Sequence, residues 1–169
     1  MLRQNSVCNS YSVTAVSVLC LTDNTRKLLD EIYLEWKGDL KFTADRAGFQ
    51  TPIDGNQETG PSPVGLLMES VAACAAIDVV VILKKGKEEL ESLTVETKAL
   101  RAEHPPQFIK RLQFTFHLSG IVNEAKARRA VQLSFEKYCS VYHSLRKDIE
   151  LEWGFTLNGI KCDESHSGG

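Results

Sequence analysis

The feature that most constrains this chain is a long apolar segment at residues 64–83. Helix start and stop signals border it on both sides. Ser62 offers an N-cap, Pro63 suits the first helical position, and the Lys-Lys-Gly sequence at 84–86 supplies a basic last turn and a C-terminal glycine. The segment therefore predicts a single helix with apolar side chains on nearly every face.

A helix that is apolar all round is either buried in a core or inserted in a membrane. Glu69 and Asp78 argue against the membrane, because each would cost about 2.5–3.5 kcal/mol near the bilayer centre. We therefore predict a central core helix and no membrane partner. A domain with only one other substantial helix has too few elements to cover it, so we expect a homodimer in which the partner subunit does so.

Apolar and polar residues alternate with a period of two before this helix. The alternation runs through residues 31–44 around a Gly38-Asp39 turn, which predicts a hairpin, and residues 48–53 could add a third strand. Residues 54–61 are rich in turn-forming side chains and are interpreted as a loop.

After the helix the pattern predicts two strands, a second helix and a last strand. The strands are expected at 93–99 and 112–118, with His104-Pro105-Pro106 connecting them, and the last strand at 149–157. Asn123 caps the second helix, whose apolar residues keep helical spacing as far as Tyr138. The order β-β-(β)-α-β-β-α-β predicts the α+β class with a mostly antiparallel sheet.

The length predicts one domain, placed at residues 30–160. Residues 1–29 are interpreted as an N-terminal extension, because the apolar stretch at 13–21 makes a poor export signal. The Ser, His and Gly composition near the end predicts a flexible tail at 161–169.

Charge and cysteine content exclude several functions. The formal net charge is only -2 and no basic stripe exists, so we expect no nucleic-acid partner. The five cysteines are scattered, without a C-x-x-C pair or zinc-type spacing. We therefore expect no zinc site of the usual cysteine and histidine spacing, and a reducing cytoplasmic location.

Two cysteines are placed where they could react. Cys74 lies midway along the apolar helix between two pairs of alanines, which leave space around its sulfur, and Cys139 follows Phe135 by one helical turn. Both could equally be small hydrophobic core residues. If the two thiols meet, one could be oxidised and the other could resolve it as a disulfide.

Three stretches carry a resemblance to a known family. They are Gly60-Pro61-Ser62-Pro63, the helix in which Cys74 is followed, after two alanines, by Ile-Asp-Val-Val at 77–80, and the Lys-Tyr-Cys-Ser-Val sequence around Cys139. They are similar to the two cysteine motifs of the OsmC/Ohr family, and most similar to its YhfA-like branch. The resemblance covers roughly residues 32–157 and implies an OsmC-like fold and an intertwined homodimer.

The resemblance also implies a chemistry of oxidative-stress defence. In family peroxidases the first cysteine attacks a hydroperoxide, organic or hydrogen peroxide, and becomes a sulfenic acid. The second cysteine condenses with it, and a dithiol reductant such as a lipoylated protein restores both thiols. By resemblance Cys74 is the attacking cysteine and Cys139 the resolving one, with no metal or tightly bound cofactor.

Two departures from the family pattern favour an alternative function. Val64 stands where family peroxidases carry a glutamate, and Lys37 or Gly38 stands near the position of their activating arginine, with Arg46 further along. A thiolate in an apolar helix needs a cation or donor nearby to offset desolvation. The alternative is a non-catalytic small-molecule-binding or redox-sensing protein. For catalysis, the candidate cation is Lys37 of the partner subunit.

Three other polar residues receive mainly structural interpretations. Asp78 is one turn after Cys74 on the same helix face and is expected to be structural or to orient a neighbour. Glu69 points about 140° away from Cys74 around the helix. His143 is expected to face solvent, with assistance to the Cys139 thiol as the alternative.

Overall fold

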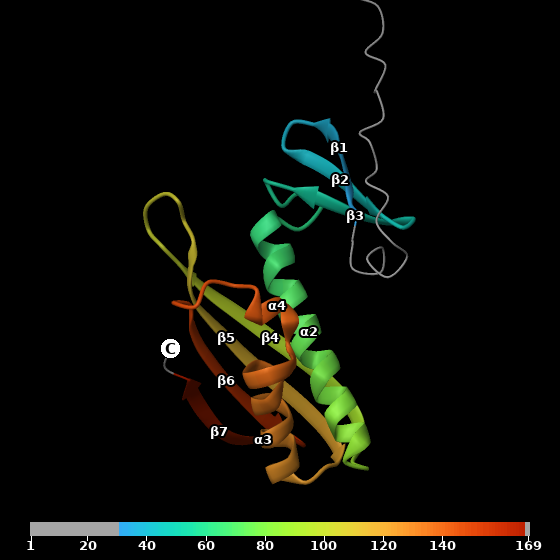
Figure 1. The fold of residues 1–169 in the computed structure, drawn as a ribbon, viewed down its shortest axis with the longest axis vertical. Coiled ribbons are helices and arrows are strands. Elements are labelled where there is room, and N and C mark those ends of the chain that lie inside the picture. The colour runs from blue at the N-terminus through green and yellow to red at the C-terminus, as the bar shows by residue number, and fades with distance from the viewer. Residues whose placement is uncertain (1–30, 168–169) are drawn as a thin grey trace, which may run out of the picture.

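The computed structural model describes residues 31–167, with side chains described as far as residue 162, and the predicted extension at 1–29 lies outside that range. The chain forms two sheets joined by a long helix (Figure 1). The first sheet, here called the N-terminal sheet, is an antiparallel meander of β1 (Tyr33–Gly38), β2 (Lys41–Arg46) and β3 (Phe49–Asp54). The predicted hairpin and the third strand are thus confirmed.

Helix α2 (Pro63–Lys85) follows β3 and is the predicted apolar helix. The Ser62 side chain accepts a hydrogen bond from the Gly65 N–H, as expected of an N-cap. In the described residues, α2 is the helix long and apolar enough to cross a membrane. One face of it instead packs on β4, α3 and the segment after α3, burying Val71, Ala75, Val79 and Leu83. The opposite face leaves Ile77 63% and Val81 42% exposed, so a single subunit covers the helix only in part.

The second sheet, here called the C-terminal sheet, has the order β4-β5-β6-β7. Its strands are β4 (Glu89–Arg101), β5 (Ile109–Ile121), β6 (Glu150–Leu157) and β7 (Ile160–Ser167). Pairing is antiparallel except between β5 and β6, which run parallel, so the sheet is mixed. The predicted α+β class is confirmed.

The core lies between this sheet and the helices on one of its faces (Figure 1). Every second residue from Leu112 to Leu118 in β5 is buried there, and Phe114 and Phe116 contact the ring of Phe135 at centroid distances of 5.1 and 6.1 Å. Aromatic packing thus joins the sheet to the segment that carries Cys139.

The second predicted helix is divided into three parts. Helix α3 (Glu124–Leu133), capped by the Asn123 side chain, passes into a π-helical turn, η1 (Ser134–Tyr138), and α4 (Ser140–His143) follows. Tyr138 keeps helical spacing with the apolar residues of this segment, yet its side chain is 48% exposed. The wider π turn accommodates an extra residue, which rotates Tyr138 away from the core and Cys139 into it.

Strand β7 occupies most of the segment at 161–169 for which the sequence predicts a flexible tail. Strand β7 pairs with β6, and Asn158 and Gly159 both have positive φ in the turn between them. Asn-Gly is the preferred pair for such a two-residue hairpin turn, and an edge strand is held mainly by backbone hydrogen bonds. The Asn-Gly pair is thus the sequence signal for this last hairpin.

Candidate active site

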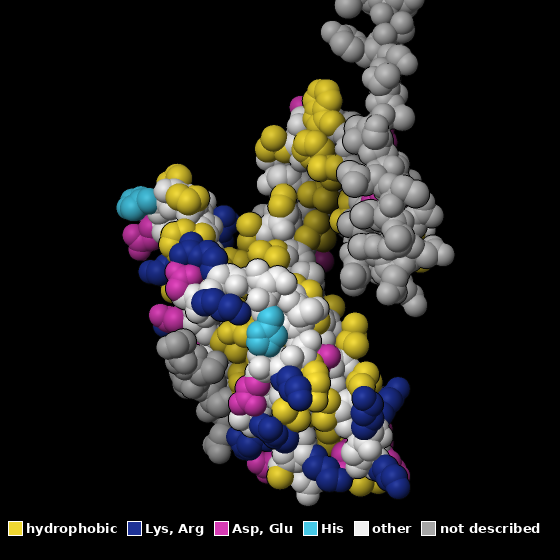
Figure 2. Space-filling view, in the orientation of Figure 1, with side chains coloured by type: hydrophobic (Ala, Val, Ile, Leu, Met, Phe, Trp, Pro, Cys, Tyr) yellow, Lys and Arg dark blue, Asp and Glu magenta, His cyan; other side chains and the backbone are white. Residues whose placement is uncertain are grey.

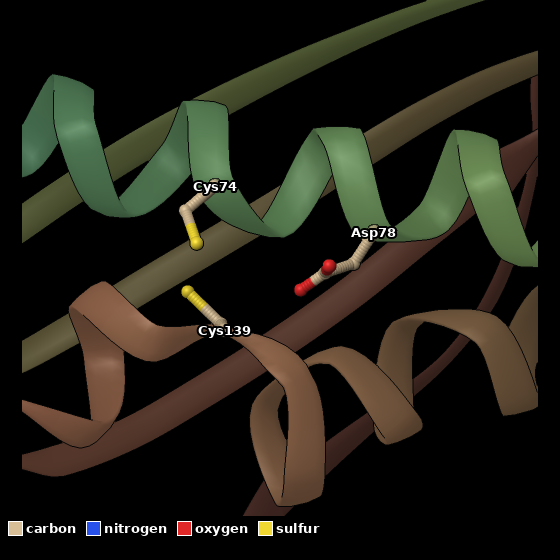
Figure 3. Close-up of side chains that lie close together, drawn as sticks. All are labelled: Cys74, Asp78 and Cys139. Carbon is tan, nitrogen blue, oxygen red and sulfur yellow. The ribbon is translucent and has the colours of Figure 1, made fainter. Parts of the chain in front are cut away.

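Cys74 lies on the face of α2 that looks toward η1 and α4, near the middle of the helix (Figure 3). Its side chain is only partly buried, whereas Ala75 and Val71 beside it are fully buried against the core. The neighbours of Cys74 along the helix are small alanines on both sides. Cys74 therefore has the partial exposure that a reactive thiol needs.

Cys139 is positioned by the π turn and by the start of α4. Its backbone N–H donates to the Ser134 carbonyl at 2.8 Å, the five-residue bond that closes the π turn. Its sulfur accepts a hydrogen bond from the Tyr142 N–H at 3.5 Å and so caps α4. Because Cys139 is fully buried, its sulfur has little freedom to turn away from α2.

The two sulfurs and the Asp78 carboxylate form one cluster. The Sγ atoms of Cys74 and Cys139 and a carboxylate oxygen of Asp78 all lie within 4.8 Å of one another. Figure 3 shows the two thiols pointing toward each other from opposite elements, with Asp78 reaching into the same space. The structure thus brings together the two cysteines that the sequence singled out.

The electrostatic environment gives the two thiols different tendencies to ionise. Burial raises the pKa of the Cys139 thiol to about 12, which the Tyr142 N–H opposes and the neighbouring Cys74 and Asp78 reinforce. Such a thiol is protonated at neutral pH. Cys139 is therefore unsuited to attack a substrate first, while the more exposed Cys74 is accessible.

Comparison with known proteins shows the family of this chain. The model of the OsmC-like protein family matches residues 55–154. Protein YhfA of Escherichia coli is 35% identical over 127 residues, which cover 73% of this chain and 95% of that protein. This chain belongs to the OsmC family.

Solved structures show the same fold at lower sequence identity. A protein of Aquifex aeolicus matches with a TM-score of 0.72 and 28% identity, over 77% of this chain and 96% of that chain. An organic hydroperoxide resistance protein from Legionella pneumophila matches with a TM-score of 0.57 and 15% identity, over 76% of this chain and 96% of that chain. The second likeness concerns the fold alone.

The other candidate residues of this OsmC-family chain are exposed, paired with other residues or packed against the core. Lys37, on the N-terminal sheet, is exposed and forms an ion pair with Glu35 at 2.6 Å. Glu69 is exposed, and His143 also faces solvent, as predicted. Val64 is partly buried and packs against the core in the first turn of α2.

Ser134 is the site residue that the sequence analysis missed. It is fully buried, and its hydroxyl donates a hydrogen bond to Asp78 Oδ2 at 3.0 Å. The bond fixes the carboxylate in its position between α2 and η1. No motif or periodicity pointed to it, since a serine within a predicted helix is an ordinary residue.

Two thiols and a carboxylate are donor groups of the kind that a soft metal ion accepts, and no other group of three such side chains at this spacing occurs among residues 31–162. A metal held here would occupy both thiols and would have to deprotonate the buried one. Reversible thiol chemistry needs the same two sulfurs free, so the two uses exclude each other.

Proposed function

We propose that this chain is a thiol-dependent peroxidase that reduces organic hydroperoxides, or hydrogen peroxide, in the cytoplasm. The observation that carries the proposal is the meeting of one partly exposed and one fully buried thiol within 4.8 Å. That asymmetry suits an attacking and a resolving cysteine. The hydroperoxide resistance protein from Legionella pneumophila, with the same fold, supports the substrate class.

The chemistry takes two steps. The Cys74 thiolate attacks the terminal peroxide oxygen, the O–O bond breaks, and the alcohol leaves after gaining a proton, so that Cys74 becomes a sulfenic acid. Cys139 then attacks the Cys74 sulfur, the S–S bond forms, and the hydroxyl leaves as water. A dithiol reductant, such as a lipoylated protein, supplies two electrons and two protons to restore both thiols.

The test follows dithiol-dependent loss of a bulky organic hydroperoxide between pH 6 and 9. We expect Cys74→Ser to abolish turnover and Cys139→Ser to allow one oxidation before it stalls. Cys162→Ser removes another buried thiol, one that lies on β7, and should leave turnover unchanged. Equal rates for wild type and Cys74→Ser at every pH would refute the proposal.

A non-catalytic binding or redox-sensing role is the second candidate. The observations in its favour are Val64 at the start of α2 and the engagement of Lys37 with Glu35. A sensor would form the Cys74–Cys139 disulfide once without rapid turnover. Peptide mass mapping after peroxide treatment, set against the turnover rate, separates the two functions.

We also propose that the chain acts as a homodimer, with the partner subunit covering α2 and the N-terminal sheet. Figure 2 shows hydrophobic side chains gathered over β1–β3 and along α2. Trp36 is 65% exposed and Ile77 is 63% exposed, and such a contiguous apolar surface typically marks an interface. A three-stranded sheet that exposes its apolar side chains lacks a core of its own.

Light scattering at micromolar concentration tests the dimer. We expect Ile77→Asp to shift the protein toward the monomer, because the charge would be buried unpaired at the interface. Lys110→Glu, an exposed charge reversal at the start of β5, is the control and should keep the dimer. A wild-type monomer under these conditions would contradict the proposal.

A further inference from the structure

Asp78 is an unexpected residue for its place in the fold. It lies one turn after Cys74 in an otherwise apolar stretch of α2, is partly buried, and its carboxylate reaches into the same space as the two sulfurs (Figure 3). The buried Ser134 hydroxyl holds one of its oxygens at 3.0 Å. A carboxylate that is partly desolvated and oriented in this way has a fixed relation to the thiols, which a simple surface acid would not have.

The resolving step of the proposed reaction requires a base. Only a thiolate attacks sulfur efficiently, yet the pKa of Cys139 is raised to about 12 by burial. At pH 7 a thiol with that pKa is ionised in only about one molecule in a hundred thousand. Waiting for spontaneous ionisation would make disulfide formation slow.

Several groups surround Cys139 and shift its pKa, and one of them is a candidate for this base. From α4 the Tyr142 N–H donates to the sulfur, and from α2 the Cys74 thiol and the Asp78 carboxylate face it, while the Val71 carbonyl, a very weak base, accepts from the sulfur at 3.9 Å. On α3 and η1, Arg129 and Glu136 form an ion pair with each other at an exposed position. Of these neighbours, Asp78 combines closeness with the ability to accept a proton.

We propose that the Asp78 carboxylate is the general base for Cys139 when that thiol attacks oxidised Cys74. The proposal rests on the peroxidase function. As the S–S bond forms and the S–O bond of the Cys74 sulfenic acid breaks, Asp78 takes the proton from Cys139 Sγ. It then passes the proton to the departing hydroxyl oxygen, which leaves as water, and the carboxylate is restored. No further oxidant or proton source is needed.

The same placement sets the order of oxidation. Before peroxide arrives, the negative charge of Asp78 disfavours the Cys139 thiolate, so the buried thiol stays protonated and unreactive. Once Cys74 is oxidised, proton transfer to Asp78 accompanies the attack and no free thiolate is required. A separation of up to 4.8 Å is bridged by a small rotation or by one water, as is common before a reaction begins.

The test separates resolution from the first attack. A disulfide reagent that releases a coloured thiolate reports both: Cys74 releases one equivalent, and Cys139 releases the second as the intrachain disulfide closes. We expect Asp78→Asn to leave the first phase within about threefold of wild type and to slow the second by about a hundredfold or more, the usual contribution of a general base. Metal chelator is present throughout.

The pH profile distinguishes a base from a structural group. In Asp78→Asn the second phase should rise about tenfold per pH unit from pH 6 to 9, because burial still holds the Cys139 pKa above this range and its ionisation then depends on hydroxide. The wild-type second phase should rise less steeply. Ser134→Ala, which releases the carboxylate from its hydrogen bond, should slow the second phase by a smaller factor without changing the first.

Glu69→Gln is the matched control, because it neutralises the other acidic residue of α2, which is exposed. Both of its phases should equal those of wild type. A second phase in Asp78→Asn within threefold of wild type, or equal slowing of both phases, would overturn the role of Asp78.

A parallel reaction with an organic hydroperoxide separates this inference from the proposed function. In that reaction Asp78→Asn should accumulate a trappable Cys74 sulfenic acid. If wild type and Asp78→Asn both yield no sulfenic acid or disulfide with peroxide, the peroxidase function fails, while the reagent phases still decide the role of Asp78.

Discussion

The N-terminal and C-terminal sheets share one kind of sequence pattern but lie in opposite environments. In the C-terminal sheet the alternating apolar residues of β5 are buried under the helices, with Phe114 and Phe116 fully inaccessible. In the N-terminal sheet the exposed fractions of Trp36 and Phe49 are 65% and 79%. Alternation therefore predicts strands well, but whether a face is covered depends on what packs against it.

Truncation of one large aromatic side chain in each sheet should show the largest contrast. Phe114→Ala should lower the free energy of unfolding by about 3–5 kcal/mol, because it empties a packed site between β5 and Phe135. Trp36→Ala should change the stability of the single subunit by within about 0.5 kcal/mol and act mainly on the monomer–dimer equilibrium.

Denaturant unfolding combined with light scattering, at several protein concentrations, measures both effects. Equal losses of stability for the two variants in dilute monomeric protein would break the comparison. It would mean that the N-terminal sheet has a covered face within one subunit.

Two glycines, one in each sheet, should show the same contrast in the cost of adding a side chain to the backbone. Gly120, in β5, has φ +128, and a Cβ there would approach the Glu89 carbonyl oxygen to 2.1 Å. Gly38, at the end of β1, has φ +102 and open space around it. Gly120→Ala should cost about 3 kcal/mol from strain and collision together, and Gly38→Ala about 1 kcal/mol from strain alone.

Thermal unfolding of the two glycine variants checks this expectation. A milder effect at Gly120 than at Gly38 would show that the β4–β5 pairing can shift to make room. In that case the C-terminal sheet would be the more adaptable of the two.

The junction between the regions should respond to acid with a smaller effect. Asp54 is the last residue of β3, and burial alone would raise its pKa. Its carboxylate accepts hydrogen bonds from the Asn56, Glu58 and Thr59 backbone N–H groups. These bonds hold the pKa of Asp54 below the usual value of 3.8. A lowered folded-state pKa adds stability above the unfolded-state pKa. That stability is lost as the pH falls through the folded-state value.

Asp54→Asn should therefore lower the unfolding temperature at pH 7 and flatten its decline below about pH 4. Thermal melts between pH 2.5 and 7 measure this, with the exposed turn residue Asp39→Asn as the control. An unchanged acid profile in Asp54→Asn would show that this loop does not fix the N-terminal sheet to α2.

Much of the fold follows from local signals in the sequence. Ser62 and Asn123 marked the two helix starts by their side-chain chemistry, and the period of two marked the strands. The parallel pairing of β5 with β6 and the pairing of β7 were not predicted, because which strands lie side by side is decided by tertiary packing and, for β7, by an overlooked Asn-Gly turn.

The candidate site was only half predictable. Cys74 and Cys139 were chosen from family motifs, since spacing alone does not show that residues on separate elements meet. Ser134 became visible only through its contact with Asp78, which joins residues far apart in the sequence. The π turn was also hidden, because a run of helix-forming residues does not reveal where one extra residue is accommodated.

Because of that π turn, the direction of the Cys139 sulfur depends on how many residues the chain has between 134 and 138. In a continuous α-helix each residue advances about 100° around the axis, so in a regular helix of the same length Tyr138 would take the inward place that Cys139 now occupies. Restoring regular α-helical bonding at that length would turn the second sulfur away from the first, whereas deleting one residue between 134 and 138 would keep it inward. In the π turn the backbone lacks the regular hydrogen bonds of an α-helix. A redesigned sequence of the same length that restored those bonds would separate the two thiols without altering either of them.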